Sequence, residues 1–175
     1  LFFAANLKNN ALYLNQGELR FKDATEASGI SAKSGGWCTG VSVVDINNDG
    51  MLDIYVGQVG EFEILNGRNQ LFVCQEIKPD GTPVYVERAK EYGLALVGFS
   101  THAVFFDYDL DGDLDLFQMN HSLHKNGTFG PRKNFMGSFH PLSGDKMLRN
   151  DKGKFVDVTK ASGINSTALG YGLGV

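Results

Sequence analysis

A segment of ten residues recurs along this sequence, and the recurrence limits the fold more than any other feature. Phe21–Ile30 matches Phe155–Ile164, with Phe-x-Asp-x-Thr-x-Ala-Ser-Gly-Ile in both, and Tyr85–Leu94 is a looser middle copy. The glycines at the ninth position of these copies are 64 and 70 residues apart. Self-similarity at such a period is typical of arrays in which each repeat is one supersecondary unit. We therefore expect successive copies of one small unit.

An acidic motif of nine residues occurs in each complete period. Asp107–Asp115 reads Asp-Tyr-Asp-Leu-Asp-Gly-Asp-Leu-Asp, and Asp45–Asp53 reads Asp-Ile-Asn-Asn-Asp-Gly-Met-Leu-Asp. Both place side-chain oxygens at positions 1, 3, 5 and 9, a glycine at position 6 and a carbonyl for ligation at position 7, as calcium loops do. Ordinary acidic turns are the alternative. We expect two Ca²⁺ sites, one formed by Asp45, Asn47, Asp49, Met51 and Asp53, the other by Asp107, Asp109, Asp111, Asp113 and Asp115.

The two loops differ at one ligand position and are not expected to be EF-hands. Asn47 leaves the first loop one carboxylate short at position 3, which predicts weaker binding there. The twelfth position, where an EF-hand has a bidentate Glu, is Val56 or Gln118. Short runs of β-branched and aromatic residues flank both loops, so each loop is predicted to join two antiparallel strands. These runs are 41–44, 54–56, 103–106 and 116–119.

The remaining repeat elements complete a four-stranded unit. A further hairpin is expected from Asn10–Asn15, Asn69–Cys74 and Asp145–Asn150, each followed by a turn and then by the ten-residue segment, which should end in a helical turn at its glycine. Four-stranded antiparallel blades repeated radially make a β-propeller. We expect an all-β fold with two complete blades and partial flanking ones, in repeats of roughly 1–40, 41–102 and 103–175, and the other blades from the rest of the same chain.

Composition excludes several classes of function. Eight of the 20 acidic residues lie in the two loops, and the chain has no basic stripe with interleaved aromatics that would indicate nucleic acid. No apolar run is long enough to span a bilayer. Cys38 and Cys74 are expected to be small buried residues, with a disulfide as the alternative. The chain starts without Met, so the lack of a signal peptide does not exclude export.

The paired acidic loops and the Phe-x-Asp-x-Thr-x-Ala-Ser-Gly-Ile segments resemble FG-GAP/VCBS repeats. The likeness is closest to the cartilage acidic protein and UnbV type, with integrin α-subunit propellers more distant, and it covers nearly the whole chain. It implies a propeller of seven or eight blades, with Ca²⁺ in the hairpin between the first two strands of a blade. It also implies a secreted or cell-surface protein used for adhesion or for binding a protein or glycan.

The longest irregular stretch, 121–144, is the candidate partner surface. Insertions of this length in a compact repeat are often functional, although a lid packed on its own blade is the alternative. The resemblance places such a loop opposite the metal hairpins. Repeat-position aromatics, Trp37, Phe99 and Tyr171, are expected in the core. The residues proposed for partner contact are His121, His124, Lys125, Arg132 and Lys133.

A non-enzymatic, calcium-stabilised binding module is the function that the sequence favours. The first alternative is a polysaccharide lyase or hydrolase, which would need paired carboxylates or a Tyr or His base in a cleft. We find no such pair outside the acidic loops, and His121 and His124 lack a third metal ligand. The other alternative is a structural subunit of a surface or outer-membrane assembly.

Overall fold

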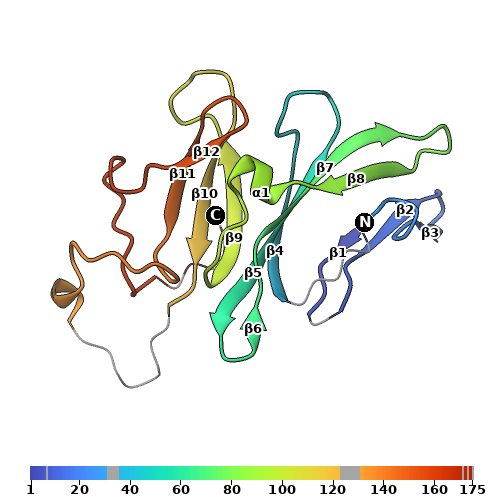
Figure 1. Cartoon of the computed structure of the whole chain (residues 1–175). Coiled ribbons are helices and arrows are strands. Elements are labelled where there is room, and N and C mark those ends of the chain that lie inside the picture. Colours follow the sequence, from blue (N-terminus) through green and yellow to red (C-terminus); the bar gives the residue numbers. More distant parts are fainter. Residues whose placement is uncertain (7, 31–35, 123–130, 171, 173, 175) are drawn as a thin grey trace.

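The chain folds into antiparallel sheets that follow one another along the sequence, as its computed structural model shows (Figure 1). The structure describes residues 1–6, 8–30, 36–122, 131–170, 172 and 174. Within this part, helix is limited to α1 (Ala89–Tyr92) and the 3-10 turn η1 (Arg132–Asn134). The all-β class predicted from the sequence is confirmed.

The middle sheet is the first complete copy of the predicted unit. Its strands are β4 (Trp37–Val44), β5 (Asp53–Phe62), β7 (Gln70–Ile77) and β8 (Pro83–Glu87), which pair in the order β4-β5-β7-β8. A short strand that the sequence did not predict, β6 (Leu65–Asn66), pairs with the end of β5. The predicted four-stranded antiparallel unit is confirmed here, with a small hairpin added to it.

The other two sheets are a second complete copy and a partial one. The complete copy contains β9 (Ser100–Phe106), β10 (Asp115–Asn120), β11 (Lys146–Asn150) and β12 (Phe155–Asp157), in the order β12-β11-β10-β9. The partial copy has three strands in the order β1-β2-β3. Its strands are β1 (Phe2–Phe3), β2 (Ala11–Asn15) and β3 (Phe21–Asp23).

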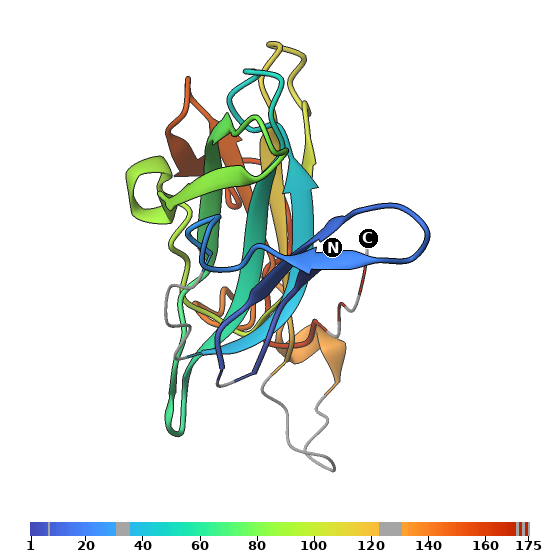
Figure 2. The ribbon, with the colours of Figure 1, turned by 90° about the vertical axis from the view of Figure 1, so that its right-hand side faces the viewer.

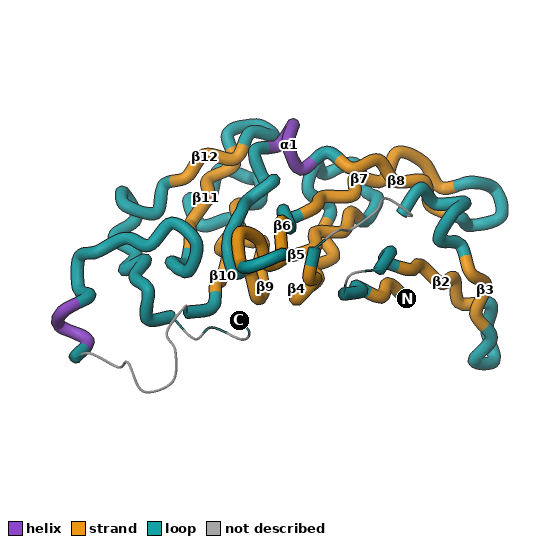
Figure 3. The backbone as a smooth tube through the Cα atoms, turned by 60° about the horizontal axis from the view of Figure 1, so that its bottom comes forward, coloured by secondary structure: helices purple, strands orange, loops and turns teal. Residues whose placement is uncertain are grey.

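The sheets are arranged like a fan, with the first strands of the two complete copies side by side (Figures 1 and 3). Thr39 Oγ1 on β4 donates to the carbonyl of Ser100 on β9 at 2.7 Å, and Thr101 Oγ1 on β9 donates to the carbonyl of Gly172 at 2.8 Å. Each of these threonines lies two residues after an aromatic residue that recurs in the repeats, Trp37 or Phe99. The same contact thus links each first strand to the segment one repeat later.

The hydrophobic core lies between the sheets, because the middle sheet is covered on both faces. One cluster, between the middle and C-terminal sheets, includes Tyr55, Leu71 and Leu116. Another, between the N-terminal and middle sheets, includes Val56 and Phe72. Alternate residues of β5 and β7 therefore face opposite neighbours, as the two-residue period of a strand requires. This two-sided burial explains the nearly continuous apolar run of β5.

A buried polar network crosses one of these interfaces. The Asn69 side-chain amide donates to the Tyr55 hydroxyl at 2.7 Å and to Gln118 Oε1 at 3.0 Å. Its oxygen accepts the backbone N–H of Gln58 at 2.8 Å. Buried amides are costly unless paired, so this network favours one alignment of the middle and C-terminal sheets.

The glycine that ends each ten-residue segment contacts the following sheet. A Cβ added to Gly29 would lie 2.7 Å from the carbonyl oxygen of Tyr85, and one added to Gly93 would lie 2.8 Å from that of Phe155. Gly163, at the same repeat position, has nothing within 4 Å of such a Cβ. All three have a positive φ, between 75° and 80°. The segment is thus a docking element between consecutive sheets.

Two expectations about these repeat positions need correction. The helical turn before the glycine forms only in the middle copy, as α1 capped by Gly93, while the other two copies are turns. Phe99 is buried as predicted, but the prediction for Trp37 is wrong, because 45% of it is exposed. Phe62, at the β5 end of the added hairpin, packs edge-on against Phe99 at 5.8 Å. In the first copy, the connection that corresponds to this hairpin is residues 4–10. It is shorter and contains no aromatic residue that could pack against Trp37 in the same way. Tyr171 lies outside the described residues.

Both cysteines are buried, as predicted, and they form no disulfide. Cys38 lies on β4 and Cys74 on β7, and both belong to the apolar cluster between the N-terminal and middle sheets. They act there as small core side chains.

Candidate metal centre

The two acidic motifs form the loops between β4 and β5 and between β9 and β10, at one edge of the fan. Val44 pairs with Asp53 across the first loop, and Phe106 pairs with Asp115 across the second. Both loops lie at the same end of the molecule, as two views show (Figures 1 and 2). The prediction that each loop joins two antiparallel strands is confirmed, and the loops are not EF-hands.

The first Asp of each motif holds the turn together. Asp45 accepts the N–H of Asp49 at 3.0 Å and that of Gly50 at 2.9 Å. In the second loop Asp107 makes the corresponding contacts with the N–H groups at positions 5 and 6, both at 3.1 Å. Because these contacts repeat, the two loops share one backbone design.

The last Asp of each motif is fully buried and connects its loop to the third strand of the sheet. Asp53 accepts the N–H of Ile46 at 3.0 Å and that of Cys74 at 2.7 Å. Asp115 likewise accepts the N–H of Tyr108 at 3.0 Å and that of Asn150 at 2.8 Å. This contact was not foreseen, because the sequence assigned position 9 only to an ion. A carboxylate oxygen that accepts one N–H keeps a second lone pair, so the same oxygen can still bind a metal ion.

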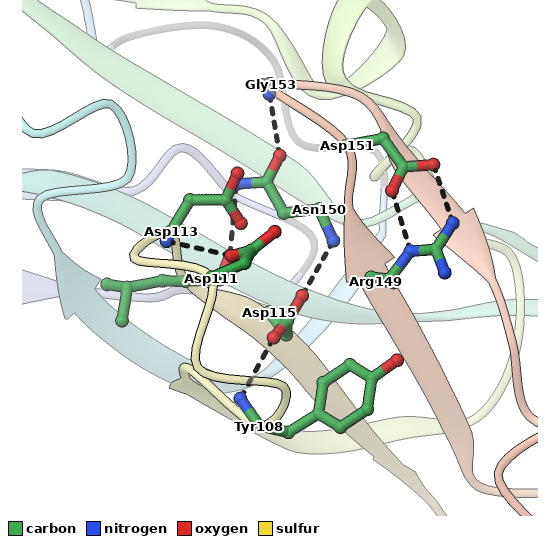
Figure 4. A network of polar contacts seen from close by, with 9 residues as sticks. Tyr108, Asp111, Asp113, Asp115, Arg149, Asn150, Asp151 and Gly153 are labelled. Carbon is green, nitrogen blue, oxygen red and sulfur yellow. Dashed lines mark hydrogen bonds and ion pairs between the residues drawn. The ribbon is translucent and has the colours of Figure 1, made fainter.

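Asn150 is a functional residue that the sequence analysis missed. Its side-chain amide donates to the carbonyl of Leu114 at 3.1 Å, and its oxygen accepts the N–H of Gly153 at 2.7 Å (Figure 4). It therefore ties the second loop to the turn between β11 and β12. The signal available was an Asn at the same repeat position in the first copy, Asn15.

Three carboxylates of the second loop converge. Oxygen atoms of Asp107, Asp109 and Asp115 all lie within 4.8 Å of one another. Asp111 instead accepts the N–H of Asp113, at 3.1 Å, and stays outside this group (Figure 4). Among the described residues, no three acidic side chains of the first loop meet the same criterion, because Asn47 replaces one of them.

The electrostatics of the second loop favour a cation. Desolvation raises the pKa of Asp109, and the carboxylates at positions 5, 9 and 1 raise it further. Desolvation and Asp111 also raise the pKa of Asp113. No Lys or Arg forms an ion pair with either loop in the described part of the chain. Clustered oxygen ligands without a protein counter-charge fit Ca²⁺, which Asp107, Asp109 and Asp115 would hold.

The pKa of Asp53 is also raised, chiefly by desolvation. The N–H donors of Ile46 and Cys74 oppose this increase, and the charges of Asp49 and Asp45 add to it. An acid whose pKa is raised on folding is less stable as an anion in the folded state, so its unfavourable contribution is present at neutral pH and fades on acidification. A bound cation would offset this cost at neutral pH. The oxygen ligands of both loops therefore fit the predicted Ca²⁺.

Position 4 of each loop has a left-handed backbone, and the two loops meet this demand differently. Asn48 has φ 56° and Leu110 has φ 62°. Asn tolerates this conformation, whereas Leu does so at a cost of about 1 kcal/mol.

We expect Leu110→Asn to raise the free energy of unfolding by about 0.5–1 kcal/mol, since the Leu110 side chain is 85% exposed and makes little packing to lose. Urea denaturation in EDTA measures this, and Asn48→Leu is the matched reverse change, expected to destabilise. A change of the same sign in both variants, or destabilisation by Leu110→Asn with stabilisation by Asn48→Leu, would contradict the backbone argument.

The candidate partner residues are only partly placed. His121 follows β10, and its Nδ1 lies 2.8 Å from the carbonyl of Ser122. Lys133 is exposed on η1, at the end of the molecule opposite the acidic loops (Figures 1 and 2). The placement predicted for this stretch is thus confirmed for its described part. His124, Lys125 and the Arg132 side chain lie outside the described residues.

The comparison with known families gives one match. Residues 1–56 match the family model described as FG-GAP-like repeat, a span that runs from β1 through the whole first acidic loop into β5. No curated protein matches the chain significantly. No helix in the described part of the chain has the length and apolar character needed to cross a membrane. An FG-GAP-like repeat is therefore found at residues 1–56 of this chain.

Proposed function

We propose that this chain is part of a calcium-stabilised β-propeller that acts as a binding module outside the cytosol. The observation that carries the proposal is the repeated loop design: two acidic loops with the same backbone contacts, one of which brings three carboxylates within 4.8 Å. FG-GAP repeats are common in extracellular and adhesion-type proteins, and one is found here. The likeness to the cartilage acidic protein and UnbV type stays a prediction, as does the absence of enzymatic activity.

The propeller is supported by the repeated contacts between neighbouring sheets. Gly29 and Gly93 each dock on the next sheet, and Thr39 and Thr101 each donate to a carbonyl of the segment one repeat later. A constant contact between copies gives a constant rotation between them, which a ring of blades requires. Gly163 offers the same docking element to a further copy. Closure of the ring by blades from the same protein is part of the proposal.

The role of calcium in this proposal is structural. A bound ion neutralises loops that otherwise carry unbalanced charge, and it stabilises the folded state by mass action. At free calcium a hundredfold above Kd, one site adds about 2.7 kcal/mol. Weak sites suffice outside cells, where Kd values of about 10⁻⁴–10⁻³ M are typical of calcium-binding modules.

A calcium titration of the full-length protein, followed by thermal unfolding with EDTA controls, tests the proposal. We expect Tm to rise with calcium. Asp109→Asn should weaken the second site and Asn47→Asp should strengthen the first, each by on the order of tenfold in Kd, because ligand charge sets affinity. Isothermal titration of both variants measures this. Asp80→Asn, an exposed carboxylate outside the loops, is the control. A Tm that ignores calcium would overturn the metal sites and leave acidic turns.

A further inference from the structure

A groove of about 940 Å³ lies beside the β5–β6 hairpin, and the proposed function does not use it. Side chains from three places line it: the hairpin with Ile64 and Asn66, the β7 start with Arg68 and Gln70, and the β8–α1 region with Glu87 and Lys90. None of these residues belongs to an acidic loop. The groove is thus a separate feature of the middle repeat.

Grooves at matching positions occur in the other two repeats, so the cavity itself follows from the fold. Gln70, Glu87 and Lys90 correspond by repeat position to Ala11, Asp23 and Glu26 in the first copy, which also line a groove. They correspond to Lys146, Asp157 and Lys160 in the third copy, which line another. What distinguishes the middle groove must therefore be its lining.

The cations of the middle groove are unengaged, unlike those of the third. Lys146 lies 4.0 Å from the Asp157 carboxylate, and Lys160 lies over the Phe139 ring at 4.8 Å. In the middle groove, the described residues place no carboxylate within ion-pair distance of Arg68 or Lys90, and both side chains are exposed. The first groove has Asn9 and Glu26 at the positions of Arg68 and Lys90. Of these three grooves, the middle one alone presents two cations that no described carboxylate pairs.

The polar groups of this groove leave more donors than acceptors. Gln70 Oε1 already accepts from the Gln58 amide at 2.8 Å, which leaves the Gln70 amide as a donor. Glu87 Oε1 accepts the N–H groups of Leu71 and Ala89, at 3.1 and 2.9 Å, so one carboxylate oxygen remains. With Arg68, Lys90 and the Asn66 amide, the surplus matches an anionic ligand rich in acceptors.

We propose that this groove binds an acidic saccharide, a proposal that rests on the binding-module function and names a ligand for it. Arg68 and Lys90 meet the carboxylate, and the amides of Asn66 and Gln70 meet hydroxyls, which both donate and accept. The second Glu87 oxygen is an acceptor that saccharide hydroxyls can meet and ionised acidic side chains of a peptide cannot. Ile64, 82% exposed at the rim, offers an apolar contact to a sugar ring. The volume lies in the usual range for small-ligand sites.

The test is isothermal titration of the full-length protein with a tetrasaccharide of alternating glucuronic acid and N-acetylglucosamine, at about 0.15 M salt. The neutral tetramer of N-acetylglucosamine and a hexaglutamate peptide are the comparison ligands. We expect the acidic tetrasaccharide alone to bind, and Arg68→Gln with Lys90→Gln to weaken it by about tenfold or more. The matched control is Lys146→Gln with Lys160→Gln, in the third groove, which should leave binding unchanged.

Each result decides the proposal. No binding of the acidic tetrasaccharide, equal binding of the neutral tetramer, preferential binding of the hexaglutamate, or equal effects of the two double variants would overturn it. The exposed substitutions should not affect folding, and an unchanged calcium response of Tm in the Arg68/Lys90 variant verifies this. Calcium response and saccharide binding are measured separately, so either can fail without the other.

Discussion

Replacing Gly93 by alanine is expected to lower the free energy of unfolding by about 2–5 kcal/mol. The left-handed backbone, with φ 80°, costs a non-glycine residue about 1–2 kcal/mol. The new methyl group would also lie 2.8 Å from the carbonyl oxygen of Phe155, which sits in a strand and cannot move freely. Overpacking of this kind adds about 1–3 kcal/mol.

Gly163→Ala is the matched control. Gly163 has a positive φ, as Gly93 does, but no atom lies within 4 Å of a Cβ added there. In this 175-residue chain it should cost only the backbone term, about 1–2 kcal/mol. In the longer protein, where we propose that a further blade docks here, it should cost as much as Gly93→Ala. Urea denaturation of both variants in both lengths of chain measures the difference. Equal costs in the shorter chain would show that docking of the segment contributes little.

Replacing Asp53 by alanine is the second large effect that we expect, and it should not require calcium. The carboxylate is fully buried and accepts two backbone N–H groups, from Ile46 and Cys74. Alanine would leave both donors without a partner, at a combined cost of about 3–5 kcal/mol. Because this role is independent of an ion, the loss should appear in EDTA as well as in calcium.

The contrast is Asp109→Asn, which should be nearly neutral in EDTA and harmful only in calcium. Asp109 is exposed, and desolvation together with its neighbouring carboxylates raises its pKa, so the apo protein loses little stability when this charge is removed. Thermal unfolding of the two variants in each condition separates a residue that holds the loop from a residue that holds the ion. If Asp53→Ala were silent in EDTA, the buried contact with β7 would not be what holds the loop.

Sequence reasoning reached the all-β class and the four-stranded units because its evidence was periodic. The strands on either side of each acidic loop, the third and fourth strands and the docking glycines all follow from residues that recur at one interval. Features that occur in one copy only escaped it. The β5–β6 hairpin packs Phe62 against Phe99, and it depends on a local extension that the corresponding connection of the first copy, residues 4–10, is too short to contain.

The candidate site was predicted by residue type, but its geometry was not. The nine-residue pattern located all the acidic side chains. It could not tell Asp109, which approaches Asp107 and Asp115, from Asp111, which accepts a neighbouring N–H. Nor could it show that Asp53 and Asp115 reach the third strand, because that contact joins residues 21 and 35 positions apart. Such choices are made by tertiary packing after the local pattern is satisfied.

The acidic loops occupy one end of the sheets, while the β5–β6 hairpin and η1 lie at the other (Figure 1). Strands of the sheets separate the two ends, and no loop residue contributes to the hairpin. Changes in length or sequence at the tip of the hairpin therefore leave untouched the contacts by which Asp53 and Asp115 hold the acidic loops. This division separates a surface that can vary from the contacts that fix the loops.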